Sequence, residues 1–378
     1  MSEPISRAAG RQPLPEFIAM LALIFAVIAF SIDSMLPALP QIAAELSPGN
    51  VNRAQLVLTA FVGGMGLGLL VAGPVSDTLG RKPVIIAGFG VYALASVAAV
   101  YASSLEMLLA ARFVQGVGAA APRIVALAMV RDLYQGREMA RITSFVMMIF
   151  ILIPAEAPSI GAVIIHFVGW RGVFGGFVVL ALVGSLWLGL RRAETLPPAA
   201  RRPLNLKSLA ASAREVLLNR QVQLITLVMT LGFGQMFALL SSAQQLFVET
   251  YGTGENFPLW FAGMALLSGS GTVLNARYVM RLGMRRIVKS AYAMQVVVSG
   301  VMTVLVYADL LPEALRFPAF FLWAVSVFFM AGVTFGNLNA MALQRMGHVA
   351  GMAASVIAAA STIGAVLIAA PVGLAYDG

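Results

Sequence analysis

Eleven apolar stretches, each close to the length that crosses a bilayer, limit the possible folds of this chain more than any other feature. A membrane-spanning helix needs about 20 consecutive apolar residues. The stretches lie near 17–40, 54–76, 83–102, 106–130, 141–166, 170–190, 221–248, 258–280, 287–308, 316–342 and 350–375. The sequence therefore predicts an all-α polytopic membrane protein.

Composition excludes the other large classes. Hydrophobic residues make up 60% of the chain and charged residues only 11%, and the mean hydropathy is +0.89. A soluble domain of this size would lack polar surface, and the short alternating segments of an outer-membrane barrel are absent. With no cysteine and two distant histidines, His166 and His348, we expect neither a metal site nor another cofactor.

The net charge of +9 is spread over short loops, which is typical of the positive-inside distribution and not of nucleic-acid binding. The first apolar stretch lacks a small-residue cleavage site, so we expect a retained span. The distribution predicts that the N-terminus lies in the cytoplasm, and we expect the membrane to be the bacterial inner (plasma) membrane. The basic residues expected on the cytoplasmic side are Arg81, Lys82, Arg131, Arg137, Arg141, those from Arg191 to Arg220, Arg281, Arg285, Arg286, Lys289 and Arg345.

The longest break between apolar stretches divides the chain into three parts. We expect an N-terminal bundle of six spans at 1–192, a cytoplasmic linker at 193–220 and a C-terminal bundle of five spans at 221–378. Apolar residues recur at helical spacing within the linker, which predicts an amphipathic helix along the membrane. They are Leu206, Leu209, Ala213, Val216 and Leu217.

A weak internal repeat supports two bundles. The segment 271–286, with its Gly283 and following arginines, is similar to 73–82, although Asn275 replaces the acid Asp77. Paired repeats around a central cavity are a known plan of transporters. The second bundle would then lack its sixth span, and we expect that the chain is a truncated piece.

The segment 73–83 is a charged turn between two apolar stretches. Gly80 can adopt the positive φ that a sharp turn needs, and Asp77 can brace a neighbouring helix end. The candidate gating residues are Gly73, Asp77, Gly80, Arg81 and Lys82.

Four charged side chains fall well inside predicted spans, where an ionised group costs several kcal/mol unless it is paired or faces water. They are Asp33, Arg112, Arg123 and Glu156. Burial and a nearby arginine have opposite effects on how tightly a carboxylate holds its proton. Their balance would let Asp33 load and release a proton near neutral pH. The alternative is a span-end aspartate exposed to outer water.

One face of the fourth predicted span carries, at intervals of four, three and four residues, Arg112, Gly116, Ala119 and Arg123. Gln115 lies beside this face. Small residues between two arginines indicate a water-lined stripe facing a cavity. In the alternatives, Arg112 braces span packing, and Arg123 extends its charged end towards water.

Glu156 lies between Pro154 and Pro158, which would bend the fifth span, and Gly161 would allow close packing. Glu156 could face the cavity and pair with an arginine, or lie neutral in a helix interface. Further candidates for the substrate cavity are Met147, Met148, Phe150, Phe233, Gln235 and Met236. Flexible methionine and aromatic surfaces suit varied hydrophobic ligands.

Several stretches together resemble a known family. The pattern G-x-x-x-D-x-x-G-R-K at 73–82 resembles the loop between spans 2 and 3 of the major facilitator superfamily. Segment 33–42 resembles the first-span signature of its Bcr/CflA group of drug:proton antiporters. Segment 112–120 resembles the group's R-x-x-Q-G-x-G-A-A motif, and 154–161 its antiporter motif P-x-x-A-P-x-x-G-G. Segments 336–343 and 351–355 are similar to its spans 10 and 11.

The chain departs from these patterns at three positions. Thr78 stands where the family loop usually has arginine, and Ala162 replaces the second glycine of the antiporter motif. Glu156 stands where the family usually has an apolar residue, so it could change the preferred substrate charge or add a second proton site.

The resemblance implies a major facilitator fold, with two bundles rocking about a central cavity. It implies proton-driven efflux of small hydrophobic drugs or toxic compounds, with Asp33, Glu156 and Arg112 in proton coupling. The alternatives are export of one metabolite or siderophore-like compound, proton-coupled uptake, and a non-transporting membrane sensor. The expected partners are a small-molecule substrate, protons and the lipid bilayer, with no nucleic acid, and we expect a monomer. No nucleophile–base pair or phosphate-binding loop is present, so we expect no enzyme.

Overall fold

The computed structural model describes residues 13–376, apart from 135, 202, 345, 347 and 348, and leaves undescribed the side chains at 136, 137, 140, 141, 143–145, 147–152, 206 and 208. Every element of the described chain is helical. Its α-helices are α1 (Leu14–Asp33), α2 (Leu39–Leu46), α3 (Leu56–Leu79), α4 (Arg81–Val100), α5 (Leu105–Leu133), α6 (Gly136–Arg191), α7 (Leu206–Leu218), α8 (Arg220–Gln245), α9 (Phe257–Leu282), α10 (Met284–Tyr307), α11 (Glu313–Leu343) and α12 (Ala350–Leu374). Of these, α2 and α7 are short and the others are long. Short turns of helix are η1 (Leu36–Ala38), η2 (Val51–Gln55), η3 (Pro198–Ala200), η4 (Leu246–Thr250) and η5 (Gly254–Asn256).

The 56 residues of α6 form two helices, because the backbone at Gly169 leaves helical geometry (φ 73°, ψ 178°). With α6 counted twice, the long helices of the described chain follow the eleven predicted spans in order. Ten of its stretches are long and apolar enough to cross a membrane, and one of these, 153–191, contains the bend. The predicted all-α polytopic membrane fold is confirmed.

The first predicted span, 17–40, lies within a helical stretch, Leu14–Leu46, that is long and apolar enough to cross a membrane, but the regular α-helix ends before residue 40. In the structure α1 ends at Asp33, and the Ser34 N–H donates to the Phe30 carbonyl at 3.1 Å. Pro37 and Pro40 have no backbone N–H to continue the helix, so the chain turns through η1 into α2. The carboxylate of Asp33 is therefore placed at a helix end.

Glycines bring α3 directly against α5. A Cβ atom at Gly64 would meet the backbone of Phe113, and one at Gly116 would meet the backbone of Phe61. Backbone atoms cannot move aside as a flexible side chain can, so these glycines allow the close approach.

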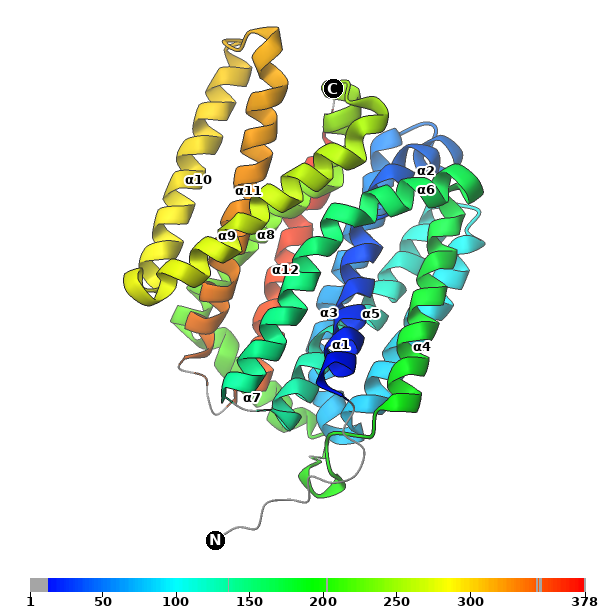
Figure 1. Cartoon of the computed structure of the whole chain (residues 1–378), viewed down its shortest axis with the longest axis vertical. Helices are drawn as coiled ribbons and strands as arrows, with labels where there is room; N and C mark the ends of the chain where they lie inside the picture. Colours follow the sequence, from blue (N-terminus) through cyan, green and yellow to red (C-terminus); the bar gives the residue numbers. More distant parts are fainter. Residues whose placement is uncertain (1–12, 135, 202, 345, 347–348, 377–378) are drawn as a thin grey trace.

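The first half of the chain, α1–α6, is more deeply buried than the second, α8–α12. The most apolar part of α1 is 67% buried, whereas that of α10 is 11% buried. Figure 1 shows α10 and α11 as an antiparallel pair at the side of the molecule. Such exposed apolar helices are typical of a lipid-facing position.

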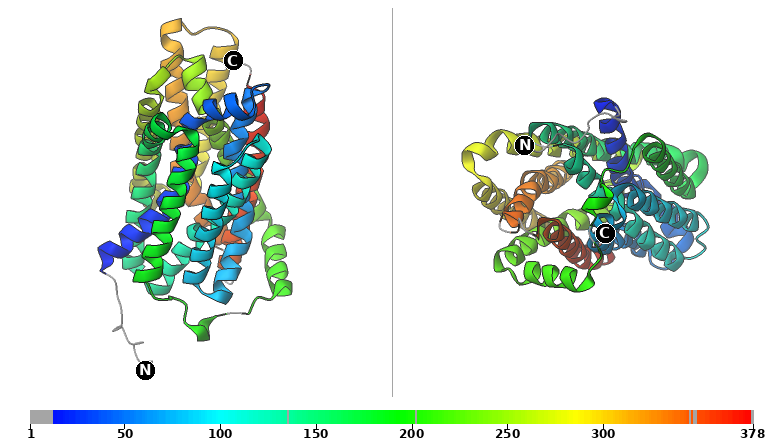
Figure 2. Two further views of the ribbon diagram at one scale, coloured as in Figure 1. Left: turned by 90° about the vertical axis from the view of Figure 1, so that its right-hand side faces the viewer. Right: turned by 90° about the horizontal axis from the view of Figure 1, so that it is seen from below.

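Two helix pairs join the halves: α3 packs along α12, and α6 packs along α9. Figure 2 shows that the beginning of α1 and the end of α12 lie at opposite ends of the molecule. We call the end at which α1 begins the inner end and the opposite end the outer end. The linker helix α7 lies at the inner end against α12 and α8, with Val216 fully buried.

Candidate functional site

Asp33 is a buried carboxylate at the outer end of α1. Its residue is 6% exposed, and no hydrogen bond or ion pair within the described part of the chain involves its side chain. The next residue, Ser34, lies against Gly161 of α6, where a Cβ would meet the Ser34 backbone. A buried charge without a partner is unstable, so this carboxyl group is stabilised when a proton or a ligand neutralises it.

Arg112 does not pair with Asp33. Its guanidinium is fully buried and donates to the Val57 carbonyl at 3.1 Å, the Ser31 carbonyl at 3.0 Å and Gln115 Oε1 at 2.5 Å. It also lies over the Phe61 ring, 4.4 Å from the centroid. The guanidinium thus joins α5 to α1 and α3 through carbonyl oxygens and an aromatic face.

The hydrogen bonds continue from Arg112 into α4. Gln115 Nε2 donates to Ser96 Oγ at 2.6 Å, and the Ser96 hydroxyl donates to the Tyr92 carbonyl at 2.7 Å. The Tyr92 hydroxyl lies 2.5 Å from the Ser31 hydroxyl. These side chains are all fully buried. The expectation that Arg112 and Gln115 line a cavity therefore fails in this conformation, because protein atoms surround both.

The predicted polar stripe of α5 faces α3 instead of water. Arg112 reaches Val57, and Gly116 packs on the backbone of Phe61. Arg123 is half-buried, and its Nη1 lies 3.3 Å from the Met65 sulfur. Ala119 is 2% exposed. The small residues of the stripe serve helix packing, and Arg123, its inner member, keeps some exposure.

Glu156 has an exposed side chain and takes part in none of the ion pairs or hydrogen bonds between described residues. The expected pairing with Arg112 or Arg123 is absent there. Pro158 is buried and Pro154 half-buried. Gly161 packs against the end of α1, which belongs to the same half, and not against the other half.

The residues of the second half that were expected to line the substrate cavity lie on α8. The rings of Phe233 and Phe335 are 4.0 Å apart between centroids. Gln235 Nε2 donates to Ser299 Oγ of α10 at 3.1 Å, and Met236 is half-buried against the main core. Gln235 therefore points into its own half. The side chains of Met147, Met148 and Phe150 lie outside the described residues.

Arg81 organises the turn between α3 and α4. Its guanidinium donates to Asp77 at 2.6 Å, Ser76 Oγ at 2.7 Å and Asp132 of α5 at 3.0 Å. The Arg81 side chain is 9% exposed, so these bonds are partly shielded from water. They tie the inner ends of α3, α4 and α5 together.

Glu194, which the sequence analysis missed, holds the same turn from the other side. Its two oxygens accept the backbone N–H groups of Arg81 at 2.9 Å and Lys82 at 3.1 Å. Gly80 precedes them with φ 109°, and a Cβ there would meet the Glu194 carboxylate. Lys82 Nζ donates to the Gly189 carbonyl at 2.7 Å. A carboxylate at the N-terminus of α4 satisfies donors that no helical carbonyl reaches.

A cavity of about 540 Å³ opens at the inner end beside this turn. Its walls come from the inner ends of α3 and α5 on one side and from α7 and α12 on the other. Asp77 and Arg131 supply charge, and Gly73 lies across from Ser355 of α12. The gating turn thus lies beside α12 of the second half, and the cavity adjoins it.

Neutral amides close the outer end, a feature that the sequence analysis also missed. Gln55 donates to Gln245, Gln245 donates to Asn52 Oδ1 at 2.9 Å, and Ser242 donates to Gln55 Oε1 at 3.1 Å. Asn52 also donates to the backbone carbonyls of Leu374 and Tyr376, at 3.3 and 2.5 Å. We call Asn52, Gln55, Ser242 and Gln245 the outer clamp. The clamp is closed at the outer end, and the cavity beside the gating turn lies at the inner end.

A family model described as the Major Facilitator Superfamily matches residues 21–369. The chain belongs to the major facilitator superfamily. A bicyclomycin resistance protein homolog of Haemophilus influenzae is 30% identical over 345 residues, covering 90% of this chain and 84% of that protein. A chloramphenicol resistance protein of Pseudomonas aeruginosa is 29% identical, covering 72% of this chain and 63% of that protein. The resemblance to the Bcr/CflA group is thereby confirmed.

The solved structures agree with the facilitator fold. A crystal structure of a D-xylose-proton symporter superposes with a TM-score of 0.72 at 14% identity, covering 95% of this chain and 90% of that chain. Membership in the superfamily also confirms the expectation of a multi-pass membrane transporter and not an enzyme.

The sequence of this facilitator holds a signal for one of the missed features but not for the other. Glu194 is the one acid between Arg191 and Arg214, and a lone acid among basic residues indicates an internal partner. The clamp amides lie at span ends, but a sequence does not tell which amides meet.

Proposed function

We propose that this chain exports small, mostly hydrophobic compounds from the cytoplasm in exchange for protons. The names of its relatives, which are bicyclomycin and chloramphenicol resistance proteins, support drug export. The energy would come from an ion gradient without a bound cofactor, and the protein would act as a monomer.

One observation carries the coupling: Asp33 is buried without a described partner. A proton can neutralise such a carboxylate, and so can a hydrogen-bond donor or cation on a substrate. The two would then compete for one group, which is the requirement of antiport. In the inward-facing state the deprotonated carboxylate holds substrate, and after the outer clamp opens a proton from outside displaces it. Arg112 would act by fixing the end of α1 through Ser31.

The charge distribution supports a bacterial inner membrane orientation with the inner end in the cytoplasm. Basic residues gather at the inner ends of the helices, as in the turns after α3, α5 and α9. Basic loops remain on the cytoplasmic side during insertion. The inner cavity would then receive substrate from the cytoplasm.

The test is compound-driven proton movement in inverted membrane vesicles. Parent and Asp33→Asn proteins are compared at equal amounts, with cationic, neutral and anionic compounds. We expect some compound to discharge the proton gradient through the parent and at least tenfold less through Asp33→Asn. Glu156→Gln, which removes the exposed intramembrane carboxylate, is the matched control and is expected to keep coupling.

Other outcomes would contradict the proposed proton site, the proposed coupling ion or the proposed direction of transport. If Glu156→Gln abolishes coupling and Asp33→Asn does not, the proton site is Glu156. If substrate moves with sodium but without protons, the proposal that protons are the coupling ion is wrong. If the parent moves no compound outward, export is wrong and the uptake alternative gains.

A further inference from the structure

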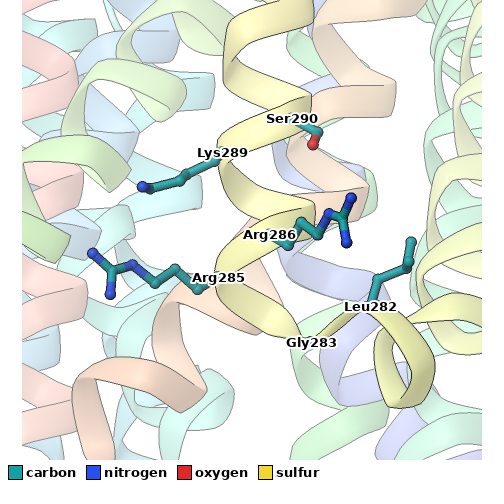
Figure 3. A pocket seen from close by; sticks show the side chains of 6 residues that line it. All are labelled: Leu282, Gly283, Arg285, Arg286, Lys289 and Ser290. Carbon is teal, nitrogen blue, oxygen red and sulfur yellow. The ribbon is translucent and has the colours of Figure 1, made fainter.

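A group of five basic side chains surrounds the inner turn between α9 and α10. Its members, which we call the basic turn, are Arg277, Arg281, Arg285, Arg286 and Lys289, and all are exposed. A cavity of about 570 Å³ lies at this turn, lined in part by Leu282, Arg286 and Ser290. In Figure 3, Arg285 and Lys289 extend to one side of α10, and Arg286 extends to the other, towards Leu282.

The chain supplies no described anion for the basic turn. From residue 221 to 376 the acids are Glu249, Glu255, Asp309 and Glu313, and all lie at or near the outer ends of α8, α9, α10 and α11. The ion pairs between described residues include none of the five basic side chains. In the first half, by contrast, Arg81 pairs with two acids and Arg191 pairs with Glu16 at 2.8 Å.

The equivalent turn of the first half holds a carboxylate. Gly80 and Gly283 both have positive φ, at 109° and 77°, and each begins a long helix followed by basic residues. At Gly80 the Glu194 carboxylate accepts two backbone N–H groups. At Gly283 no described side chain caps α10. The same backbone turn is therefore able to bind an oxyanion and has none from the described chain.

Apolar side chains continue from the basic turn along the lipid-facing helices. Met280 is 90% exposed and Leu282 is 47% exposed beside the arginines. Further along α9 and α10, large apolar side chains are exposed at Val273, Leu274, Val296, Val297 and Val301. A ligand with an anionic head and a long apolar body matches both features at the membrane boundary.

We propose that the basic turn binds the headgroup of an anionic phospholipid. The phosphate accepts hydrogen bonds from Arg286 and from the free N–H groups at the start of α10, and Arg285 and Lys289 supply further positive charge. The acyl chains lie along the apolar surfaces of α9 and α10. This site is separate from the proposed transport function and is testable without any transport assay.

The test measures lipid binding to the purified full chain in detergent by native mass spectrometry. The probes are dioleoylphosphatidylglycerol, dioleoylphosphatidylcholine and inorganic phosphate. We expect phosphatidylglycerol to bind more tightly than phosphatidylcholine, and excess inorganic phosphate not to displace it. Each basic residue near a membrane surface contributes about fivefold to anionic lipid binding, so Arg285→Gln/Arg286→Gln/Lys289→Gln is expected to bind about a hundredfold more weakly.

Two controls distinguish a loss of binding at the basic turn from an effect of net charge and from an effect of misfolding. Lys207→Gln/Arg214→Gln/Arg220→Gln removes the same charge elsewhere at the inner end and is expected to keep binding within about threefold. Leu282→Glu places an internal carboxylate at the turn, as Glu194 does at the other one, and should weaken phosphatidylglycerol binding at least fivefold. Its matched control, Leu310→Glu, adds an exposed acid at the outer end and should not.

Four results would overturn the proposal. The first is equal phosphatidylglycerol binding by the parent and the basic-turn variant. The second is an equal loss in the Lys207/Arg214/Arg220 control, which would make net charge the determinant. The third is full displacement by inorganic phosphate, which would make the ligand a free anion. The fourth is a parent that binds no phosphatidylglycerol.

Discussion

Arg112 and Arg123 share one face of α5, yet their surroundings give them different tasks. Arg112 is enclosed and donates to three oxygen atoms. Arg123 is half-buried, and its described partner is the sulfur of Met65. We expect Arg112 to contribute mainly to the stability of the first half, whereas Arg123 remains available to the inner space.

Arg112→Leu is expected to lower the free energy of unfolding by about 3 kcal/mol or more, because it leaves buried acceptors without a donor. Arg123→Leu, the matched control on the same face, should change it by less than about 1 kcal/mol, because it loses only a weak contact. Thermal unfolding of both purified variants in detergent measures the difference. Equal destabilisation would contradict the structural role assigned to Arg112.

The sequence identifies the polar residues of the spans but not their partners. Helical spacing correctly placed Arg112, Gly116 and Arg123 on one face, and it could not tell that this face meets α3. In a soluble helix the polar face points to water. In a membrane helix, lipid and protein core are both apolar, so hydropathy does not orient the face. The direction of Glu156, which is exposed and apart from the arginines, was unpredictable for the same reason.

At the scale of helices, the close approach of α3 and α5 depends on glycines. A Cβ at Gly116 would meet the backbone of Phe61 and Met65, whereas a Cβ at Gly90 of α4 would have no neighbouring atom within 4 Å. The two residues are thus a matched pair with the same chemistry and opposite surroundings.

Gly116→Ala is expected to lower the free energy of unfolding by about 1–3 kcal/mol, because the helices must move apart. Gly90→Ala should raise it slightly, since alanine is the better helix former by about 0.5–1 kcal/mol. Parallel thermal unfolding of the two variants provides the measurement. Stabilisation by Gly116→Ala would mean that α3 and α5 are less tightly packed than in this structure.

The existence and order of the helices were predictable from the length of the apolar stretches alone. Their ends were less so. The end of the regular α-helix at Asp33, inside the first span, was not predicted, because hydropathy remains high through Leu36 and Leu39, although Pro37 and Pro40 already pointed to an interruption. The division of the chain at 192 and 220 remains a prediction, and the linker helix expected within it is present as α7.

At the scale of the whole molecule, helix packing joins the halves along α3 and α12 and along α6 and α9, and the hydrogen bonds between the halves gather at the outer end. The hydrogen bonds that join described residues of the two halves belong to the outer clamp. In the proposed transport cycle, opening at the outer end would break these bonds, and each contributes about 0.5–1.5 kcal/mol. We therefore expect the clamp to bias the equilibrium between inward-facing and outward-facing forms.

Gln55→Leu combined with Gln245→Leu is expected to shift this equilibrium about tenfold towards the outward-facing form, which corresponds to roughly 1.4 kcal/mol. Leu58 lies between the halves near the clamp and is 3% exposed. The parent sequence has no cysteine, so thiol labelling of a Leu58→Cys variant reports opening of the outer end without labelling at other sites. Labelling should accelerate by a similar factor. Gln41→Leu, an exposed amide at the same end, is the control, and an equal acceleration there would argue against the clamp.

The chemistry of the clamp also suits the surroundings that it meets. With the outer end towards the exterior, Asn52, Gln55, Ser242 and Gln245 face a medium whose acidity and salinity vary with the habitat. None of these groups ionises between acidic and alkaline conditions, and hydrogen bonds between neutral amides weaken little with ionic strength. In that orientation the charged network around Arg81 would instead lie towards the cytoplasm, whose composition the cell regulates. The outer end would thus be held closed by hydrogen bonds that depend little on the pH or the salt concentration of the exterior.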